Sequence, residues 1–192
     1  MLSVLVIDDS ETRASELVAG LALAGYQVAA LLPTATDLSA KVEQLRPDAI
    51  LIHTDSPSRD TLEHLAAMNE AMPRPVVMVS NKRDSATIRK AIKAGVSSYV
   101  VDGISEKRLK PILEVALASF EEFQALRKER DEANQKLADR KVIDRAKGIL
   151  MKARGMDEDE AYNALRKLAM DRKQTVVKVA VQVLDMAELL GS

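Results

Sequence analysis

Residues 4–10 read Val-Leu-Val-Ile-Asp-Asp-Ser, so that four consecutive apolar side chains stand directly before two carboxylates. Similar short apolar runs recur through the first half of the chain, and the segments between them carry apolar residues at helical spacing. Uninterrupted apolar strands that alternate with helices are typical of a parallel sheet covered by helices on both faces. The first part of the chain is therefore predicted to be an α/β domain with a five-stranded parallel sheet. The expected strands lie near residues 3–8, 26–32, 48–53, 75–80 and 97–102.

Composition narrows the classes of function. The chain has 192 residues, which suits one domain and a second, smaller module. It has no Cys and two His, which excludes disulfides, thiolate catalysis and Cys-ligated metals and argues against a His-rich metal site. No apolar run reaches the roughly 18 residues of a membrane span, and the N-terminus lacks the pattern of a signal peptide. We therefore expect a cytoplasmic protein without membrane attachment.

The charge is divided unevenly along the chain. Residues 1–123 carry 13 Lys and Arg against 17 Asp and Glu, a net −4, whereas residues 124–192 carry 15 against 12, a net +3. This division predicts different partners for the two parts. Because the whole chain has only three Tyr and two Phe, binding of nucleic acid through a sheet of stacking aromatic rings is excluded, and helices must carry any such binding.

Two carboxylates, Asp8 and Asp9, follow the first predicted strand. Functional groups of parallel sheets gather at the carboxyl ends of the strands, and paired carboxylates there can hold a hard cation such as Mg²⁺. The same side chains can instead cap the helix predicted to begin near Ser10. Both interpretations remain open, and any Mg²⁺ binding is expected to be weak.

Residues 1–118 resemble response-regulator receiver domains, which are flavodoxin-like in fold. The resemblance rests on the pair Asp8 and Asp9, on Ser80 after the fourth strand, on Tyr99 in the fifth, and on Pro57 after the third. Receivers carry a phosphoacceptor Asp four residues before that Pro and a Lys at the end of the fifth strand. This chain has His53 and Asp102 at those positions, so the resemblance implies a degenerate receiver, or pseudo-receiver. Its expected pocket consists of Asp8, Asp9, His53, Ser80 and Asp102.

His53 has two interpretations. It is either a phosphoacceptor or metal ligand, or a neutral replacement that relieves repulsion among Asp8, Asp9 and Asp102, and the second is favoured. Asp55 is a poor substitute acceptor because it lies two residues further along, past the predicted strand end and away from the acidic pair. A carboxylate at position 102 also opposes the binding of a phosphoryl group. The sequence therefore predicts that phosphorylation is not the switch.

Residues 119–139 are predicted to form a helical coiled-coil linker. Phe123, Leu126, Ala133 and Leu137 make a thin apolar stripe on an otherwise charged helix, which needs a partner to bury it. A parallel homodimer is favoured over a solvated monomeric spacer, although Arg130 interrupts the stripe. Pro111 predicts a kink, or a short 3₁₀ segment before the main helix.

Residues 140–192 are predicted to form a small three-helix bundle without an enclosed catalytic pocket. The first helix ends near Lys152, the second spans 157–170 and the third spans 175–190. Asp157 with Glu160 resembles a capping box, Gly155 ends the first helix, and Gly191 follows the last. No nucleophile with a neighbouring base and no phosphate-binding loop is present in this module, so no enzymatic activity is expected.

This module resembles the ANTAR domain, the RNA-binding module of transcription antiterminators of the AmiR–NasR type. The resemblance rests on 140–143 (Arg-Lys-Val-Ile), 146–151 (Ala-Lys-Gly-Ile-Leu-Met), 160–162 (Glu-Ala-Tyr), 165–166 (Leu-Arg) and 169–170 (Ala-Met), in family order and spacing. Together with the receiver-like part, it is most similar to the nitrate-assimilation branch, called NasT-like. It implies binding to leader-mRNA hairpins with short loops, and a ligand-sensing repressor protein as a partner of the receiver-like domain.

Basic residues cluster in the ANTAR-like module, where they can attract phosphates. Lys147 and Arg166 are the first candidates because they lie inside the motif, whereas alternating charges that only solvate the helices explain about half of the basic cluster. Tyr162, the only aromatic residue of the module, either stacks on a loop base or packs in the core. The expected RNA-binding residues are Lys147, Arg166, Tyr162, Arg140, Lys141, Arg145 and Lys173.

The favoured function is a dimeric regulator that holds a leader-RNA hairpin and promotes transcription antitermination, controlled by a protein partner. A helix-turn-helix regulator on duplex DNA is the second hypothesis. It is disfavoured because residues 170–175 look longer and more charged than the usual turn before a recognition helix. A signalling scaffold without nucleic-acid binding is the third.

Overall fold

The computed structural model describes residues 1–189. By its internal contacts the chain separates into two units, Met1–Gln124 and Ala125–Ser192. The predicted division into residues 1–118, 119–139 and 140–192 stays a prediction, and the predicted helix end at Leu190 and the cap at Gly191 lie outside the described residues. Each unit is described by itself below.

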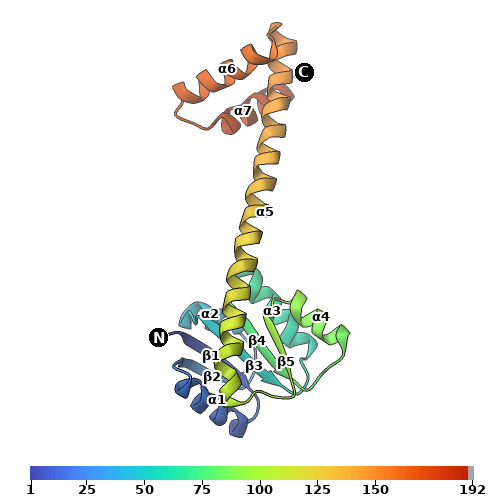
Figure 1. The fold of residues 1–192 in the computed structure, drawn as a ribbon. Coiled ribbons are helices and arrows are strands. Elements are labelled where there is room, and N and C mark those ends of the chain that lie inside the picture. The colour runs from blue at the N-terminus through green and yellow to red at the C-terminus, as the bar shows by residue number, and fades with distance from the viewer. Residues whose placement is uncertain (190–192) are drawn as a thin grey trace. The chain divides into compact units, whose positions relative to one another are not determined.

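The first unit contains the predicted α/β fold (Figure 1). Its five strands are all parallel and lie in the order β2-β1-β3-β4-β5. Each strand begins and ends within one residue of its predicted bounds, because a continuous apolar run marks each one in the sequence. The strands are β1 (Ser3–Asp8), β2 (Gln27–Leu32), β3 (Ala49–Thr54), β4 (Val76–Ser80) and β5 (Ser98–Val101).

Helices cover both faces of the sheet (Figure 1). Side chains alternate along β1, so that Leu5 and Ile7 join the core on one face, and Val4 and Val6 join the core on the other. The first core is closed by α2 (Leu38–Leu45), α3 (Arg59–Ala71) and α4 (Ser85–Lys93). The second is closed by α1 (Glu11–Leu23) and the beginning of α5 (Glu106–Arg154). The receiver-like fold class is thereby confirmed.

The strand register brings the predicted pocket together. Asp8 at the end of β1 pairs in register with His53 of β3, and Thr54 pairs with Ser80 of β4. Side chains that are 45 residues apart in the sequence thus share one edge of the sheet. This edge is formed by the carboxyl ends of the strands, where functional groups collect in parallel sheets.

Helix α5 is a single helix of 49 residues with Pro111 inside it. The predicted 3₁₀ segment before the main helix is therefore wrong. Pro111 lacks the N–H that would bond to the carbonyl of Lys107, but the apolar face that includes Leu109 and Leu113 is buried against the sheet and stabilises the helix on both sides of the proline.

The second unit contains the end of α5 with α6 (Glu158–Asp171) and α7 (Val176–Leu189), close to the three predicted helices. Asp157 and Glu160 form the predicted capping box, and Gly155 ends α5 with a φ of +65°. Small and aliphatic side chains of all three helices form the core. The buried members of this core are Ala146, Leu165, Ala169, Val179 and Ala180.

The connection between α6 and α7 is shorter than the segment 170–175 that was compared with a helix-turn-helix turn. It consists of the four residues 172–175, because α6 extends to Asp171. The length argument against a helix-turn-helix is therefore wrong, since four residues fit the usual turn. Among the described helices, none is both long and apolar enough to cross a membrane.

Candidate functional site

The receiver pocket, formed by Asp8, Asp9, His53, Asp55 and Ser80, is the first candidate site. The Asp8 side chain is fully buried, and its Oδ1 accepts a hydrogen bond of 2.9 Å from the N–H of Ser10, the residue before α1. Ser10 is the N-cap residue and precedes the first turn of α1, so this contact does not cap the helix, and the capping interpretation stays a prediction. Asp9 makes its contact with a side chain of α1, described below.

His53 stands where receivers carry the phosphoacceptor. Its Nδ1 lies 3.2 Å from Asp8 Oδ2, and within the described part of the chain this nitrogen makes no hydrogen bond. Burial lowers the pKa of His53 below its ordinary value, although the negative charge of Asp8 opposes this effect. The imidazole is therefore neutral at pH 7, and its side chain is only 13% exposed. Both facts favour a replacement residue over a reactive group.

Arg13 of α1 was not predicted as a pocket residue. Its guanidinium lies 3.1 Å from Asp8 Oδ1, 2.7 Å from Asp9 Oδ1 and 3.1 Å from Asp55 Oδ1. The hydrogen bond to Asp8 is the largest of the effects that raise the pKa of Arg13. The contact with Asp55 also corrects the expectation that Asp55 lies apart from the acidic pair, because Arg13 joins all three carboxylates.

Ser80 contributes to the pocket through the loop after β3. Its hydroxyl donates a hydrogen bond of 3.1 Å to the backbone carbonyl of Asp55. Asn81 donates from its side-chain amide to Asp55 Oδ1 at 3.2 Å. The loop that carries Asp55 is thus fixed by hydrogen bonds from the end of β4.

Asp102 does not belong to the pocket. Its carboxylate pairs with Arg83, with distances from Oδ1 of 2.5 Å to Nη2 and 3.1 Å to Nε. The side chain of Asp102 is half exposed, and the residue has a φ of +64°. The expectation that His53 relieves repulsion from Asp102 is therefore wrong, because a left-handed backbone and a surface ion pair hold this carboxylate elsewhere.

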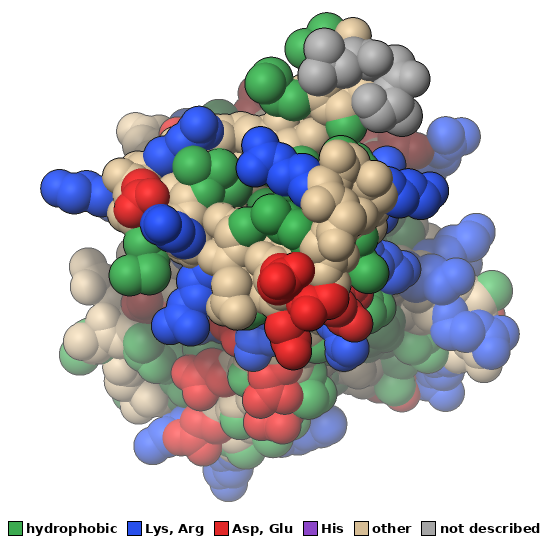
Figure 2. Space-filling model, turned by 90° about the horizontal axis from the view of Figure 1, so that it is seen from above, with side chains coloured by type: hydrophobic (Ala, Val, Ile, Leu, Met, Phe, Trp, Pro, Cys, Tyr) green, Lys and Arg blue, Asp and Glu red, His purple; other side chains and the backbone are tan. Residues whose placement is uncertain are grey.

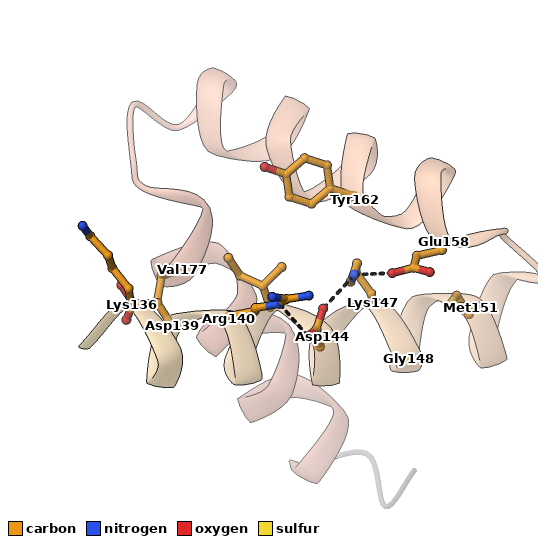
Figure 3. A pocket seen from close by; sticks show the side chains of 11 residues that line it. Lys136, Asp139, Arg140, Asp144, Lys147, Gly148, Met151, Glu158, Tyr162 and Val177 are labelled. Atoms are coloured by element: carbon orange, nitrogen blue, oxygen red, sulfur yellow. Dashed lines mark hydrogen bonds and ion pairs between the residues drawn. The ribbon is translucent and has the colours of Figure 1, made fainter. Parts of the chain in front are cut away.

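The second candidate site is an open groove of about 650 Å³ in the ANTAR-like unit (Figure 3). We call it the helical groove. Most of its lining comes from one face of α5, while α6 and α7 complete it. It is lined by Lys136, Asp139, Arg140, Ile143, Asp144, Lys147, Gly148, Met151, Glu158, Tyr162 and Val177.

Lys147 lies in this groove between two carboxylates (Figure 3). Its Nζ is 2.7 Å from Asp144 Oδ1 and 2.6 Å from Glu158 Oε1, and its side chain is 13% exposed. The hydrogen bonds to Asp144 and to Glu158 raise the pKa of Lys147. The hydrogen bond between Lys147 and Asp144 also lowers the pKa of Asp144. Because its charge is already paired, Lys147 is better suited to connect α5 to α6 than to contact a phosphate directly.

Tyr162 is not a core residue. It is 42% exposed and lines the helical groove from α6, with its ring lying along that helix (Figure 3). Arg166 is also exposed and follows four residues later on α6, so the two side chains lie on the same face of this helix. An aromatic ring and a guanidinium that has no ion pair within residues 1–189 therefore share one exposed face of α6.

The other predicted RNA-binding residues do not share one surface. Arg140 lines the groove, whereas Lys141 and Arg145 are exposed about 100° to 140° further around α5. Lys173 lies in the turn between α6 and α7 with a φ of +52°. On the face of this unit in Figure 2, Lys and Arg side chains are scattered among hydrophobic ones.

Lys136 is a groove residue that sequence reasoning missed. It is exposed and precedes Arg140 by four residues on α5, so both point to the same side of the helix. The four-residue spacing from Arg140 could have indicated this shared side, but Lys136 lies before the ANTAR-like motif and inside the predicted linker.

Comparison with known proteins identifies the class of both units. Residues 4–114 match the response regulator receiver domain, and residues 131–184 match the ANTAR domain. A CheY-like receiver domain from Methanospirillum hungatei superposes with a TM-score of 0.56 at 20% identity, covering 64% of this chain and 98% of that one. That similarity concerns the fold alone. The first unit is a receiver domain of the response-regulator class.

Two curated relatives extend the similarity through the second unit. The transcriptional regulatory protein PdtaR of Mycobacterium tuberculosis is 28% identical over 95% of this chain and 89% of its own length. The nitrate regulatory protein of Klebsiella oxytoca is 28% identical over 88% of this chain and 45% of its own length. The chain belongs to the response regulators that combine a receiver domain with an ANTAR domain. By name, the first relative is a transcriptional regulatory protein and the second a nitrate regulatory protein.

Proposed function

We propose that the protein binds leader-mRNA hairpins as a homodimer through its ANTAR domain and thereby promotes transcription antitermination, without enzymatic activity of its own. The observation that carries this proposal is the exposed pair Tyr162 and Arg166 beside the helical groove, within residues that match an RNA-regulatory domain family. One relative is named as a nitrate regulatory protein, so leader transcripts of nitrate-assimilation genes are the first RNAs to test.

The groove fits unpaired bases better than paired ones. The major groove of duplex RNA is too narrow for side chains to read, so sequence-specific proteins generally recognise loops whose bases stack on aromatic rings or Arg. A volume of about 650 Å³ is within the range of small-ligand pockets and accommodates a base. Tyr162 offers a stacking surface, while Arg166 offers a charge to the flanking phosphates. Arg140 offers a second charge, since its pair with Asp144 is long, at 3.8 Å, and its side chain is 82% exposed.

Dimerisation follows from the exposed stripe of α5. Phe123, Leu126 and Leu137 are 61%, 56% and 54% exposed, although each is a large apolar side chain. Their positions, with Arg130 and Ala133, follow the alternating spacing of three and four residues that is typical of a coiled-coil seam. A second copy of α5 carries the same stripe at the same spacing and is the partner that we propose.

Duplex DNA is the main alternative ligand, and the composition of α7 argues against it. In a helix-turn-helix the second helix enters the major groove, so it should present polar and basic side chains to the DNA. Helix α7 has one basic residue, Lys178, against Asp185 and Glu188, and it exposes Val181 and Met186. Such a helix is poorly suited to a negatively charged groove.

A titration separates RNA binding from the alternatives. Fluorescence anisotropy of the full chain is measured against a leader hairpin, the same hairpin with its loop replaced, and a duplex DNA of matched length. We expect saturable binding to the first ligand and at least about tenfold weaker binding to the other two. Equal affinity for the DNA duplex would favour the helix-turn-helix hypothesis, and no binding to any of the three would favour a scaffold.

Control of this regulator is proposed to come from a protein that binds the receiver domain, such as a ligand-sensing repressor. The acceptor position holds a neutral, mostly buried His53, and the position of the receiver Lys holds Asp102. A phosphoryl group would therefore lack both its attachment point and its neutralising cation. A protein that binds the surface of the receiver domain is the input that we propose instead.

The protein is expected to gain no phosphoryl group when it is incubated with acetyl phosphate and Mg²⁺. Intact-mass spectrometry measures this directly, and a receiver domain with the usual Asp, treated in parallel, is the positive control. A mass increment mapped to His53 or Asp55 would contradict the prediction. The variant His53→Asp restores a carboxylate at the acceptor position, and its behaviour shows whether that single change is sufficient for acceptance.

A further inference from the structure

The receiver pocket contains a cation of its own. Three carboxylates, from Asp8 at the end of β1 and from Asp9 and Asp55 in the loops after β1 and β3, surround the guanidinium of Arg13 at 3.1, 2.7 and 3.1 Å. A guanidinium is planar and always charged, and its five N–H groups can serve several carboxylates at once. Lys has only one nitrogen at its tip, whereas Arg13 uses Nε, Nη1 and Nη2 for these contacts.

The pocket needs a positive charge because of its burial. The Asp8 side chain is fully buried, and a buried carboxylate is stable only when it is paired and hydrogen-bonded. Arg13 donates to Asp8 Oδ1 from Nη2 and from Nε, at 3.1 and 3.3 Å. The other donor to this oxygen is the backbone N–H of Ser10. The buried carboxylate is therefore satisfied by the chain itself.

A divalent cation does not fit beside this guanidinium. Mg²⁺ and Mn²⁺ bind carboxylate oxygens, and one oxygen of each of the three carboxylates, its Oδ1, already accepts a hydrogen bond from Arg13. A second cation within about 4 Å of the guanidinium would also be repelled strongly in a partly buried site. Among the described residues, no cluster of three or more acidic or His side chains has the geometry of a metal site.

We propose that Arg13 is the resident cation of the receiver pocket, and that it closes the acidic site to Mg²⁺ and Mn²⁺. It replaces the weak Mg²⁺ site expected at Asp8 and Asp9. It also connects α1 to the loops that follow β1 and β3, so these loops keep one arrangement without metal or phosphate. Asp55 is fixed further by Asn81, whose amide donates to the carboxylate that Arg13 contacts. The loop edge thus offers a partner protein a constant surface.

Removing Arg13 is expected to create a divalent-cation site. Mn²⁺ binding to the full chain is measured from the electron paramagnetic resonance of the free ion, for the wild type and for Arg13→Gln. We expect the variant to bind Mn²⁺ at least about tenfold more tightly than the wild type, because three carboxylates lose the guanidinium that they share. The gained binding should disappear in Arg13→Gln combined with Asp9→Asn.

Arg83→Gln is the matched control. It removes another guanidinium of the same domain, one that pairs with the exposed Asp102 outside the pocket. This variant should bind Mn²⁺ no better than the wild type. A general change of net charge would instead affect Arg13→Gln and Arg83→Gln equally and would contradict the proposal.

Two results overturn the proposal. One is saturable Mn²⁺ binding by the wild type that is lost in Asp9→Asn, a measurement that remains decisive if Arg13→Gln does not fold. The other is a folded Arg13→Gln variant, verified by circular dichroism, that gains no Mn²⁺ site. Neither experiment contains RNA, so its outcome does not depend on the proposed function of the ANTAR domain.

Discussion

The double variant Leu126→Asp/Leu137→Asp is expected to be a monomer and to lose most of its affinity for hairpin RNA. Both leucines are more than half exposed in the single chain, on a stretch of α5 that is otherwise mostly charged or polar. Each one buried in a dimer contributes about 1.5–3 kcal/mol. A carboxylate at either position would have to be buried in place of an apolar side chain, next to its copy on the partner helix.

The loss of RNA affinity follows from linkage of two sites. When two binding domains are joined in one dimer, the second contact is intramolecular, and the overall affinity can exceed that of a single domain by about 10² to 10⁴. We therefore expect the monomeric variant to bind a two-hairpin leader RNA at least about 100-fold more weakly. Light scattering gives the mass, and fluorescence anisotropy gives the affinity.

The variant Gln124→Asp/Gln135→Asp is the control for added charge. These glutamines have the same sequence separation as the two leucines but lie on the opposite side of α5. The control should remain a dimer with unchanged RNA affinity. If the leucine variant keeps the mass of a dimer, the interface lies elsewhere, and Arg130 in the middle of the stripe would then mark a solvated helix rather than a seam.

The parts of the fold that local pattern determines were predictable from the sequence. Each strand is a continuous apolar run, so β1 and β3 were found to within one residue, and their parallel pairing placed Asp8 beside His53. The capping box of Asp157 and Glu160 depends on residues three apart and was found for the same reason. These features need no knowledge of distant contacts.

The charge pairs of both sites depend on contacts between distant segments and were missed. Arg13 follows Asp9 by four residues, a spacing that allows a helix-surface pair, but its contact with Asp55 spans 42 residues. Lys147 reaches Glu158 across the break between α5 and α6. Lys147 was predicted to contact RNA because it lies inside the ANTAR-like motif. Its pairing with Glu158 depends on how α5 and α6 pack, which the sequence pattern does not give.

Because Lys147 is already paired with carboxylates, Tyr162 and Arg166 are now the main candidates for the RNA surface. Arg166→Ala is expected to weaken hairpin binding by about 1–3 kcal/mol, since an exposed guanidinium next to the groove can contact a phosphate or a loop base. Tyr162→Ala should cost a similar amount, about 1–3 kcal/mol, if the ring stacks on a base. Tyr162→Phe retains the ring and should bind nearly as well as the wild type.

Lys147→Ala should weaken binding by a different route. It leaves Asp144 and Glu158 without their shared cation beside the groove and removes the connection between α5 and α6. If Lys147 acts through Glu158, the loss in Lys147→Ala should shrink when Glu158→Ala is also present, because the two changes then share one interaction. If Lys147 contacts RNA directly, its effect should be the same with or without Glu158.

Salt dependence distinguishes the roles of the basic residues. Loss of a phosphate contact reduces the slope of log affinity against log salt by roughly one unit, whereas loss of a base contact changes discrimination among loop sequences. Lys167→Ala is the matched control for Arg166→Ala, since Lys167 is the next residue on α6, is also exposed, and points about 100° away around the helix. Circular dichroism should be unchanged for both.

If Arg166→Ala and Tyr162→Ala bind like the wild type at every salt concentration, the RNA surface does not include this face of α6. The exposed face of α5 that carries Lys141 and Arg145 is then the next surface to test.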